Sequence, residues 1–535
     1  MKNKENGRVE RLPRTVRALR NSMDAKNHPR TIIICLDGTG DQFDNDNSNV
    51  VHFVSCLKKH SPEQQVTYYQ SGIGTYDKGG LKNGISAAMD MSVGSGLGIH
   101  VKDAYRFLMQ NYREGDKICL LGFSRGAYTV RCLAGMIHKV GLLPASNASQ
   151  INFAYSFYKD DSDNGEYLAE EFKKTFCTDV HVYFLGLFDC VASVGFFPRK
   201  LPFSKTATNT VRYFRHAMAL DEHRAKFKVC HWQQDQPGTT PEVTRRGTVD
   251  FTPVARLRRR FSRDRRFKHH KTPAGISGKQ QNGARGHDQT DDDSGDDIWD
   301  SKFKAQEKAN NRYKEFVTDA LEVWFMGAHA DIGGGAVLNE SRHMLSRIPL
   351  RWMIRQCFDC NTGILFDMAR LAEQGLDVVS LWPEYLEPTK PTSGPPPRLM
   401  TKYNKKTLAP VQRRSTFLPI GPEDYTIDDA PTVDDLNYIL PAESDEDHFD
   451  AMEPPNDQLK IAKSWWILEL WPVKIRVLSS DNEAWEKRVR FNLGRYRAIR
   501  TREPNMHWTV QKMIDDGKYT LKTRETNGTK WRQVV

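Results

Sequence analysis

The chain has 535 residues, of which 39% are hydrophobic and 10% are aromatic. This apolar content can bury a large core, which excludes wholesale disorder. The length suits either about three to four domains or one large α/β domain with appended segments. No apolar run approaches the roughly 20 residues of a membrane-spanning helix. The basic, polar N-terminus is not typical of a signal peptide, so we expect a cytoplasmic protein without a transmembrane segment.

The net charge of +11 is concentrated in one stretch of the chain. Residues 245–287 contain 13 Lys/Arg and 2 Asp/Glu, which equals the positive excess of the whole protein. An acidic run follows, and neither part has a hydrophobic period. We therefore predict a disordered, solvated insertion at 233–310. The alternative is a nucleic-acid-binding surface made by its basic residues.

The nine cysteines indicate reduced, packed thiols of an intracellular protein, because several lie in apolar runs and their number is odd. Cys357 and Cys360 form a CxxC pair. No second pair with zinc-ligand spacing follows it, so no metal site is predicted.

Short apolar runs typical of buried strands alternate with segments of helical spacing. The predicted strands are 31–36, 66–69, 117–123, 180–189 and 321–329, with a further candidate at 226–230. Helices are predicted to begin near Asn49, capped by Ser48, and to cover 99–113, 126–140 and a segment from 348 onward. This alternation predicts an α/β fold with a mostly parallel sheet covered by helices on both faces.

One motif has the context of a catalytic nucleophile. The sequence Gly122-Phe123-Ser124-Arg125-Gly126 follows the predicted strand KICLL and precedes a predicted helix. This strand–turn–helix pattern is typical of a nucleophile elbow, in which a strained turn exposes the serine at the carboxyl end of the sheet. The alternative interpretation is a tight structural turn with an unreactive serine.

A serine nucleophile needs a base, and the base needs an orienting acid; on this fold they follow the serine in the order acid, then histidine. Asp189 and His329 directly end strong predicted strands, so both should lie at the carboxyl edge of the sheet with Ser124. We predict Ser124, Asp189 and His329 as the catalytic residues.

The other candidates have weaker positions in the sequence. Asp221 is the strongest rival acid, and Asp331 is interpreted as a brace for the glycine turn that follows it. The rival histidines lie in segments predicted to be helical or polar: His138, His216, His223 and His507.

An oxyanion hole needs two backbone N–H donors. We predict the amide of Arg125, directly after the serine, and that of Gly38 in the loop after the first strand. Asp37 in the same loop either orients it or is catalytic. A phosphatase-type nucleophile loop would need an acid at position 35, which is Cys35, so the orienting role is favoured.

With these residues identified, the chain resembles an α/β-hydrolase domain family related to phospholipase effectors of type VI secretion systems, with bacterial and fungal members. The matching blocks are LDGTG…SNV (36–50), YYQSGIGT (68–75), GDKICLLGFSRGAYTVR (115–131), FLGLFDCVASVG (184–195), HAMALDEHR (216–224), VWFMGAHADIGGG (323–335) and IPLRWM (348–353). The resemblance implies ester hydrolysis by Ser124, Asp189 and His329, with phospholipid as the substrate of the characterised effectors. Met326 departs from the proline common in the family, and we expect this to alter the turn but not the chemistry.

Three regions are predicted: a polar tail at 1–29, the α/β-hydrolase catalytic domain at 30–370 with its insertion, and a C-terminal accessory or cap region at 371–535. The last contains SWWILELWPVKIRVL (464–478), in which Trp465, Trp466 and Trp471 lie beside Lys474 and Arg476. Such a mixture suits a membrane interface, and the alternative is that the tryptophans pack on the hydrolase core.

The predicted function is a serine esterase or lipase that acts on a lipid or other small ester substrate and needs no cofactor or metal. The alternatives are a catalytically silent scaffold on a hydrolase fold and a nucleic-acid-binding protein that uses the basic insertion.

Overall fold

The structure is a computed structural model that describes residues 12–21, 28–72, 96–191, 211–232, 317–420 and 441–535. These residues all belong to one compact unit of the chain. The predicted insertion at 233–310 lies outside the described residues, and so does the end of the matching block 184–195, from residue 192 on.

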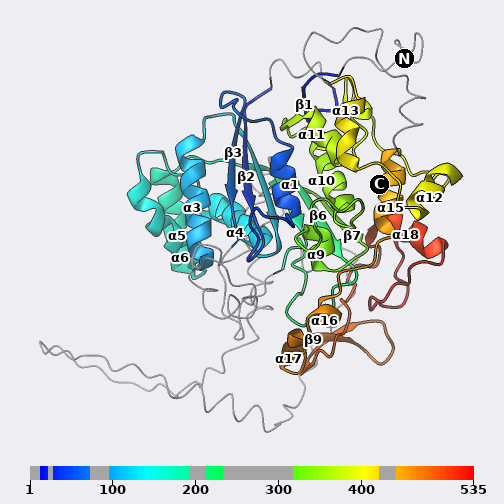
Figure 1. Cartoon of the computed structure of the whole chain (residues 1–535). Coiled ribbons are helices and arrows are strands. Elements are labelled where there is room, and N and C mark those ends of the chain that lie inside the picture. Colours follow the sequence, from blue (N-terminus) through cyan, green and yellow to red (C-terminus); the bar gives the residue numbers. More distant parts are fainter. Residues whose placement is uncertain (1–11, 22–27, 73–95, 192–210, 233–316, 421–440) are drawn as a thin grey trace, which may run out of the picture. The chain divides into compact units, whose positions relative to one another are not determined.

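An eight-stranded sheet forms the centre of the fold, and its neighbouring strands all pair in parallel (Figure 1). The strands, in order from one edge to the other, are β12 (Arg532–Val534), β11 (Asn505–His507), β7 (Asp319–Phe325), β6 (Val211–Ala219), β5 (Val182–Phe188), β4 (Lys117–Phe123), β2 (Thr31–Leu36) and β3 (Gln65–Gln70). Parallel strands are buried on both faces and need nearly continuous apolar runs, which β2 and β4 have.

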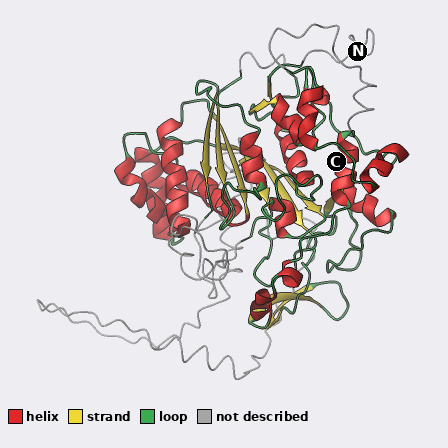
Figure 2. Cartoon of the chain, viewed as in Figure 1, coloured by secondary structure: helices red, strands yellow, loops and turns green. Residues whose placement is uncertain are grey.

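Different helices cover the two faces of the sheet (Figure 2), because successive side chains of a strand point to opposite faces. Ile32 and Ile34 of β2 pack in one core cluster with α3 (Gly96–Asn111), α4 (Ser124–Val140), α5 (Ile151–Lys159) and α6 (Asp163–Phe176). Ile33 and Cys35 pack in the other cluster with α1 (Asn49–Ser55), α10 (Arg347–Asp359), α11 (Met368–Glu373) and α18 (Trp508–Asp515). The predicted fold class, a mostly parallel sheet covered by helices on both faces, is confirmed.

Most of the predicted elements are present at nearly the predicted bounds. The strands predicted at 31–36 and 117–123 are β2 and β4, and Ser48 caps α1 by accepting the Val51 amide. Two predictions are wrong: His216 lies in strand β6 and not on a helix, and 226–230 contains only an isolated bridge at Val229. The polar residues of β6 resemble a helix face in sequence, but they are satisfied inside the sheet, where His216 bonds Glu322.

Segments on both sides of the predicted domain boundaries are built into the fold. Within the predicted N-terminal tail, β1 (Thr15–Arg17) pairs with β8 (Leu365–Asp367), and Leu12 is buried. Within the predicted accessory region, β11 and β12 extend the central sheet beyond β7. The domain bounds themselves stay a prediction.

The C-terminal region also contains shorter elements. They are α12 (Pro397–Asn404), α13 (Arg414–Phe417), α15 (Glu443–Ala451), α16 (Gln458–Ile461), α17 (Trp466–Glu469) and the antiparallel pair β9 (Pro472–Leu478) and β10 (Trp485–Phe491). No helix among the described residues has both the length and the apolar character needed to cross a bilayer.

Buried ion pairs join α10 to α15. Arg351 Nη2 lies 2.6 Å from carboxylate oxygens of both Asp447 and Asp450, and Arg355 Nη2 lies 2.6 Å from Glu443. The acidic run at 443–450 is therefore a buried helix face that neutralises the arginines of a core helix.

We predict that Arg351→Met destabilises the fold strongly, because it leaves two buried carboxylates without their guanidinium. The free energy of unfolding, measured by urea denaturation, should fall by about 3–5 kcal/mol. Arg370→Met, which removes an exposed pair with Glu373, is the control and should cost less than about 1 kcal/mol. Equal losses in the two variants would contradict this account.

Candidate active site

The predicted nucleophile lies at a sharp turn between β4 and α4. Ser124 is the first residue of α4 and has a φ of 56°, a left-handed conformation that a side chain rarely adopts. A Cβ on Gly122 would lie 2.7 Å from the backbone of Ala127, and one on Gly126 would lie 2.2 Å from the carbonyl oxygen of Leu36. The strained turn and its two flanking glycines match the predicted elbow geometry.

The structure brings the three predicted residues together at the carboxyl ends of their strands. His329 Nε2 lies 2.8 Å from Ser124 Oγ, and His329 Nδ1 lies 2.6 Å from Asp189 Oδ2. A carboxylate can only accept, so Nδ1 carries the imidazole proton and Nε2 accepts from the serine hydroxyl. All three side chains are buried.

Asp189 is fully buried and is held by more than His329. Arg497 forms a two-pronged ion pair with it, with Nη1 2.6 Å from Oδ1 and Nη2 2.9 Å from Oδ2, and the Ala219 amide donates to Oδ1 at 3.0 Å. Burial by itself would raise the pKa of Asp189, but the charge of Arg497 and the hydrogen bond from His329 hold that pKa well below its usual range. Asp189 is therefore a permanent anion beside the imidazole.

His329 begins the short helix α9 (His329–Gly333), which follows β7 after a turn at 326–328, so the prediction that His329 directly ends the strand is wrong. Aromatic rings pack against its imidazole. The ring centroids of Phe123 and Phe227 both lie 4.8 Å from that of the imidazole. Burial lowers the pKa of His329 below its usual value and outweighs the opposing effect of Asp189. The imidazole is thus neutral near pH 7, which is the form that accepts a proton.

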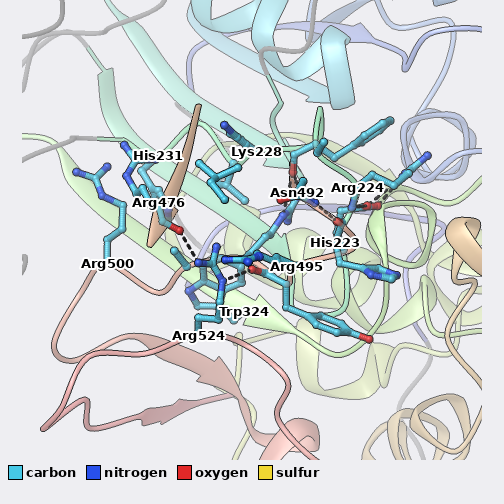
Figure 3. Close-up of a pocket in the computed structure, with 18 residues that line it drawn as sticks. His223, Arg224, Lys228, His231, Trp324, Arg476, Asn492, Arg495, Arg500 and Arg524 are labelled. Atoms are coloured by element: carbon cyan, nitrogen blue, oxygen red, sulfur yellow. Dashed lines mark hydrogen bonds and ion pairs between the residues drawn. The ribbon is translucent and has the colours of Figure 1, made fainter. Parts of the chain in front are cut away.

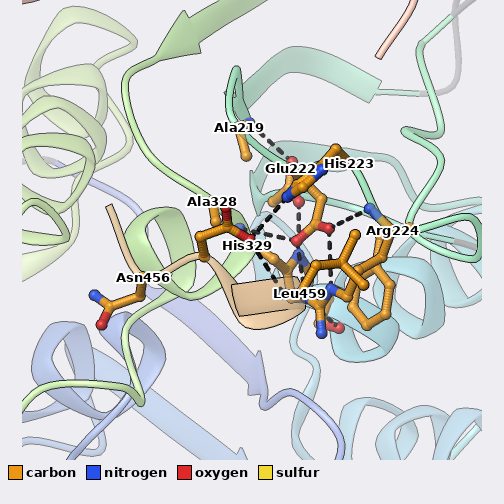
Figure 4. Close-up of polar contacts among 12 residues, drawn as sticks. Ala219, Glu222, His223, Arg224, Ala328, His329, Asn456 and Leu459 are labelled. Atoms are coloured by element: carbon orange, nitrogen blue, oxygen red, sulfur yellow. Dashed lines mark hydrogen bonds and ion pairs between the residues drawn. The ribbon is translucent and has the colours of Figure 1, made fainter. Parts of the chain in front are cut away.

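A second buried carboxylate holds the backbone beside His329. Glu222 Oε2 accepts the His329 amide at 3.3 Å and pairs with Arg224 at 2.7 Å, as Figure 4 shows. Arg224 in turn lies over the Phe227 ring, 3.5 Å from its centroid. These contacts fix the backbone of His329 and one of the rings packed on its imidazole.

The two backbone amides predicted to bind the oxyanion differ in whether they already donate to another acceptor. Arg125 lies in the first turn of α4, where amides have no acceptor within the helix. The Gly38 amide donates to Asp37 Oδ1 at 2.9 Å and would have to share this bond with a bound oxyanion. Asp37 also accepts from Ser48 and Tyr69, both at 2.9 Å, so its carboxylate holds the loop in the orienting role that the sequence favoured.

The rival acids have other partners. Asp221 Oδ2 accepts the Gly327 amide at 2.8 Å and so fixes the turn between β7 and His329. Asp331 accepts the amides of Ala328 and Asn456, both at 2.8 Å, so it holds the turn before His329 and a C-terminal segment and not the glycine turn that was predicted. Burial raises the pKa of Asp331 to about 6.

The rival histidines are held in separate networks. His216 Nε2 accepts the Cys190 amide at 3.0 Å and so supports the residue after the acid, and His223 bonds Asp457 at 2.8 Å. His138 lies in the last turn of α4, and His507 bonds Thr509. Among the described residues, no group of three or more His, Cys, Asp or Glu side chains is placed to hold a metal ion.

Sequence reasoning missed Arg497, Glu222 and Phe227. Glu222 lies inside the block HAMALDEHR, but no spacing rule distinguishes it from its charged neighbours. Arg497 lies in the basic segment RYRAIR, 308 positions from Asp189, and nothing in that segment indicates a buried partner. Only the packing of the C-terminal region on the loops after β5 and β6 brings it to the site.

The fold and the strand–turn–helix position of Ser124 define an α/β-hydrolase-like protein. The family model of the type VI secretion phospholipase effector Tle1-like catalytic domain matches residues 30–356. The chain belongs to this family, as its sequence blocks predicted. Membership in a phospholipase effector family indicates a lipid hydrolase.

Individual relatives are more distant. The uncharacterized protein YEL023C of Saccharomyces cerevisiae is 26% identical over 541 residues, which cover 90% of this chain and 78% of the yeast protein. A crystal structure of an uncharacterized protein from Pseudomonas aeruginosa aligns at 15% identity and a TM-score of 0.28, covering 63% of this chain and 47% of that one. The Tle1 effector bound to the VgrG spike of the type 6 secretion system aligns at 17% identity and a TM-score of 0.23, covering 38% and 47%. This chain therefore spans about half the length of the two solved structures.

We predict that Gly126→Ala disturbs the elbow, because the new Cβ would collide with the backbone of β2. Overpacking of this kind should lower the free energy of unfolding by about 1–3 kcal/mol, measured by urea denaturation. Gly394→Ala is the matched control, because a Cβ there meets nothing within 4 Å. An unchanged stability in Gly126→Ala would show that β2 and α4 can separate without cost.

Proposed function

We propose that this protein is a serine hydrolase that cleaves carboxylic ester bonds of lipids, with phospholipid the favoured class. The single observation that carries the proposal is the line of hydrogen bonds from Asp189 through His329 to Ser124, at 2.6 and 2.8 Å. Membership in the phospholipase effector family supports lipid as the substrate class.

The proposed reaction uses each residue in one role. His329 Nε2 takes the proton of Ser124 as the hydroxyl oxygen attacks the ester carbonyl, and the amides of Arg125 and Gly38 bind the oxyanion. Asp189 holds the tautomer of the imidazole and stabilises the imidazolium. His329 then protonates the leaving alcohol, and water attack on the acyl-enzyme releases the fatty acid and restores the serine.

Arg497 is proposed as a positioning residue in this mechanism. Its guanidinium neutralises the buried carboxylate and fixes both oxygens, so Asp189 can accept from His329 in one orientation only. The same positive charge limits how far Asp189 can raise the pKa of His329, and this favours the neutral, basic form of the imidazole.

A membrane contact through the tryptophan-rich segment is also proposed. Trp465 is buried against Phe227, but the following residues are exposed: Trp466 by 41%, Ile467 by 66% and Leu470 by 61%. Exposed aromatic and aliphatic side chains on one short helix suit the interfacial region of a bilayer. Contact there would keep the enzyme at the surface that holds its substrate.

We predict that Ser124→Ala abolishes both labelling by a fluorophosphonate probe and turnover of phospholipid and simple ester substrates. The variant should keep its circular dichroism spectrum and unfolding midpoint, because only one hydroxyl is lost. Labelling that persists in the variant would place the nucleophile elsewhere and end the proposal.

We predict that Asp189→Asn lowers turnover by about 10⁴-fold, the loss seen when the carboxylate of a serine protease triad becomes an amide. Asp221→Asn is the matched control, since it neutralises another buried acid near the site that does not contact His329. Its loss of turnover should be much smaller. The opposite order of the two effects would identify Asp221 as the orienting acid.

A further inference from the structure

A pocket lies next to the proposed catalytic site but does not include Ser124 or His329. Most of residues 222–231, which follow β6, line one part of it, together with Trp324 of β7 (Figure 3). The C-terminal region supplies the rest: two residues of β9, several residues between 492 and 500, and Arg524. The pocket is shallow, and its empty space of about 570 Å³ includes the part open to solvent.

The lining of this pocket is strongly positive. Seven of its 18 lining residues are arginine or lysine, and Glu222 is the one acidic residue among them. Two of the cations have carboxylate partners, since Arg224 pairs with Glu222 and Arg497 pairs with Asp189. The other five cations of the lining are Lys228, Arg476, Arg495, Arg500 and Arg524.

Three of these five have no carboxylate partner among the described residues. Lys228 donates to the carbonyl oxygen of Lys474, and Arg524 donates to those of Tyr496 and Arg476. The structure gives the Arg495 side chain no hydrogen bond or ion pair within the described ranges. Carbonyl oxygens orient cations but do not cancel their charge, so the pocket keeps a net positive charge.

Mutual repulsion between these cations is visible in one of their pKa values. Partial burial, and then the charges of Arg495 and Arg476, lower the pKa of Arg524 to about 10. Cations held this close to one another destabilise the empty pocket, and an anion bound among them would remove that cost.

We infer that this pocket binds a phosphate group, as carried by a soluble phosphate ester or by the headgroup of an anionic phospholipid. Guanidinium groups match the spacing of phosphate oxygens and bind them through two parallel hydrogen bonds. The surplus of cations favours a group with two negative charges over a single carboxylate. The aromatic side chains of Trp324 and Tyr496 also line the pocket.

The site is separate from the proposed chemistry, although Arg497 belongs to both. Because Ser124 is not part of the pocket, the Ser124→Ala variant should bind phosphate like the natural protein. Failure of the hydrolase proposal and failure of the phosphate site can therefore be told apart.

The test measures binding of inorganic phosphate and of pyrophosphate to the full chain by isothermal titration calorimetry. It also measures sedimentation with vesicles of phosphatidylcholine, with and without phosphatidic acid. The pocket variant is Lys228→Gln with Arg495→Gln, and the matched control is Lys405→Gln with Arg413→Gln, which removes two exposed charges outside the pocket. Circular dichroism of both double variants checks that they fold.

The Kd for pyrophosphate should be at least about 10-fold higher in the pocket variant than in the natural chain. In the control variant it should differ little from that of the natural chain. If pyrophosphate binds but vesicle sedimentation does not depend on phosphatidic acid, the site is assigned to a soluble ester. Vesicle binding that needs both phosphatidic acid and the pocket cations assigns it to a lipid headgroup. No binding of any of these probes, or equal losses in the two double variants, would overturn the inference.

Discussion

A single buried charge, the carboxylate of Asp189, constrains most of the structure around the candidate site. An anion with no exposed surface requires hydrogen bonds and a positive partner, and it has them in His329, Arg497 and the Ala219 amide. Each partner comes from a different part of the chain. The loops after β5, β6 and β7 and the C-terminal segment must therefore meet at one point for the carboxylate to stay ionised.

This requirement explains why the C-terminal region is closely attached to the family domain. Arg497 lies beyond the residues that the family model matches, yet it neutralises an acid inside them. Glu469 strengthens the attachment by accepting the amides of Ala225 and Gly494, which joins the loop after β6 to the C-terminal segment. The positively charged pocket lies at the same junction, so its cations are brought together by the contact that completes the candidate site.

Local patterns were sufficient to predict the elements that hold the catalytic candidates. The β-branched run of β2, the apolar run of β4 and the glycines around Ser124 each reflect a requirement of the nearby backbone, which short-range sequence records. The prediction failed at β6, because a central strand with polar side chains has the same composition as an amphipathic helix. What distinguishes the two is whether Glu322 of the neighbouring strand is there to bond His216.

The sequence by itself determined the α/β class, the family, and the positions of Ser124 and Asp189 directly after strands. It placed His329 at the end of β7, whereas a turn at 326–328 separates the two. Those features depend on residues close together in the chain. Only the tertiary structure decided that Arg497 supports the acid, that the acidic residues of α15 are buried against arginines, and that scattered cations form one pocket. Such pairings depend on distances across hundreds of residues. A lysine, arginine or aspartate on a buried ion pair is indistinguishable in sequence from one exposed to water.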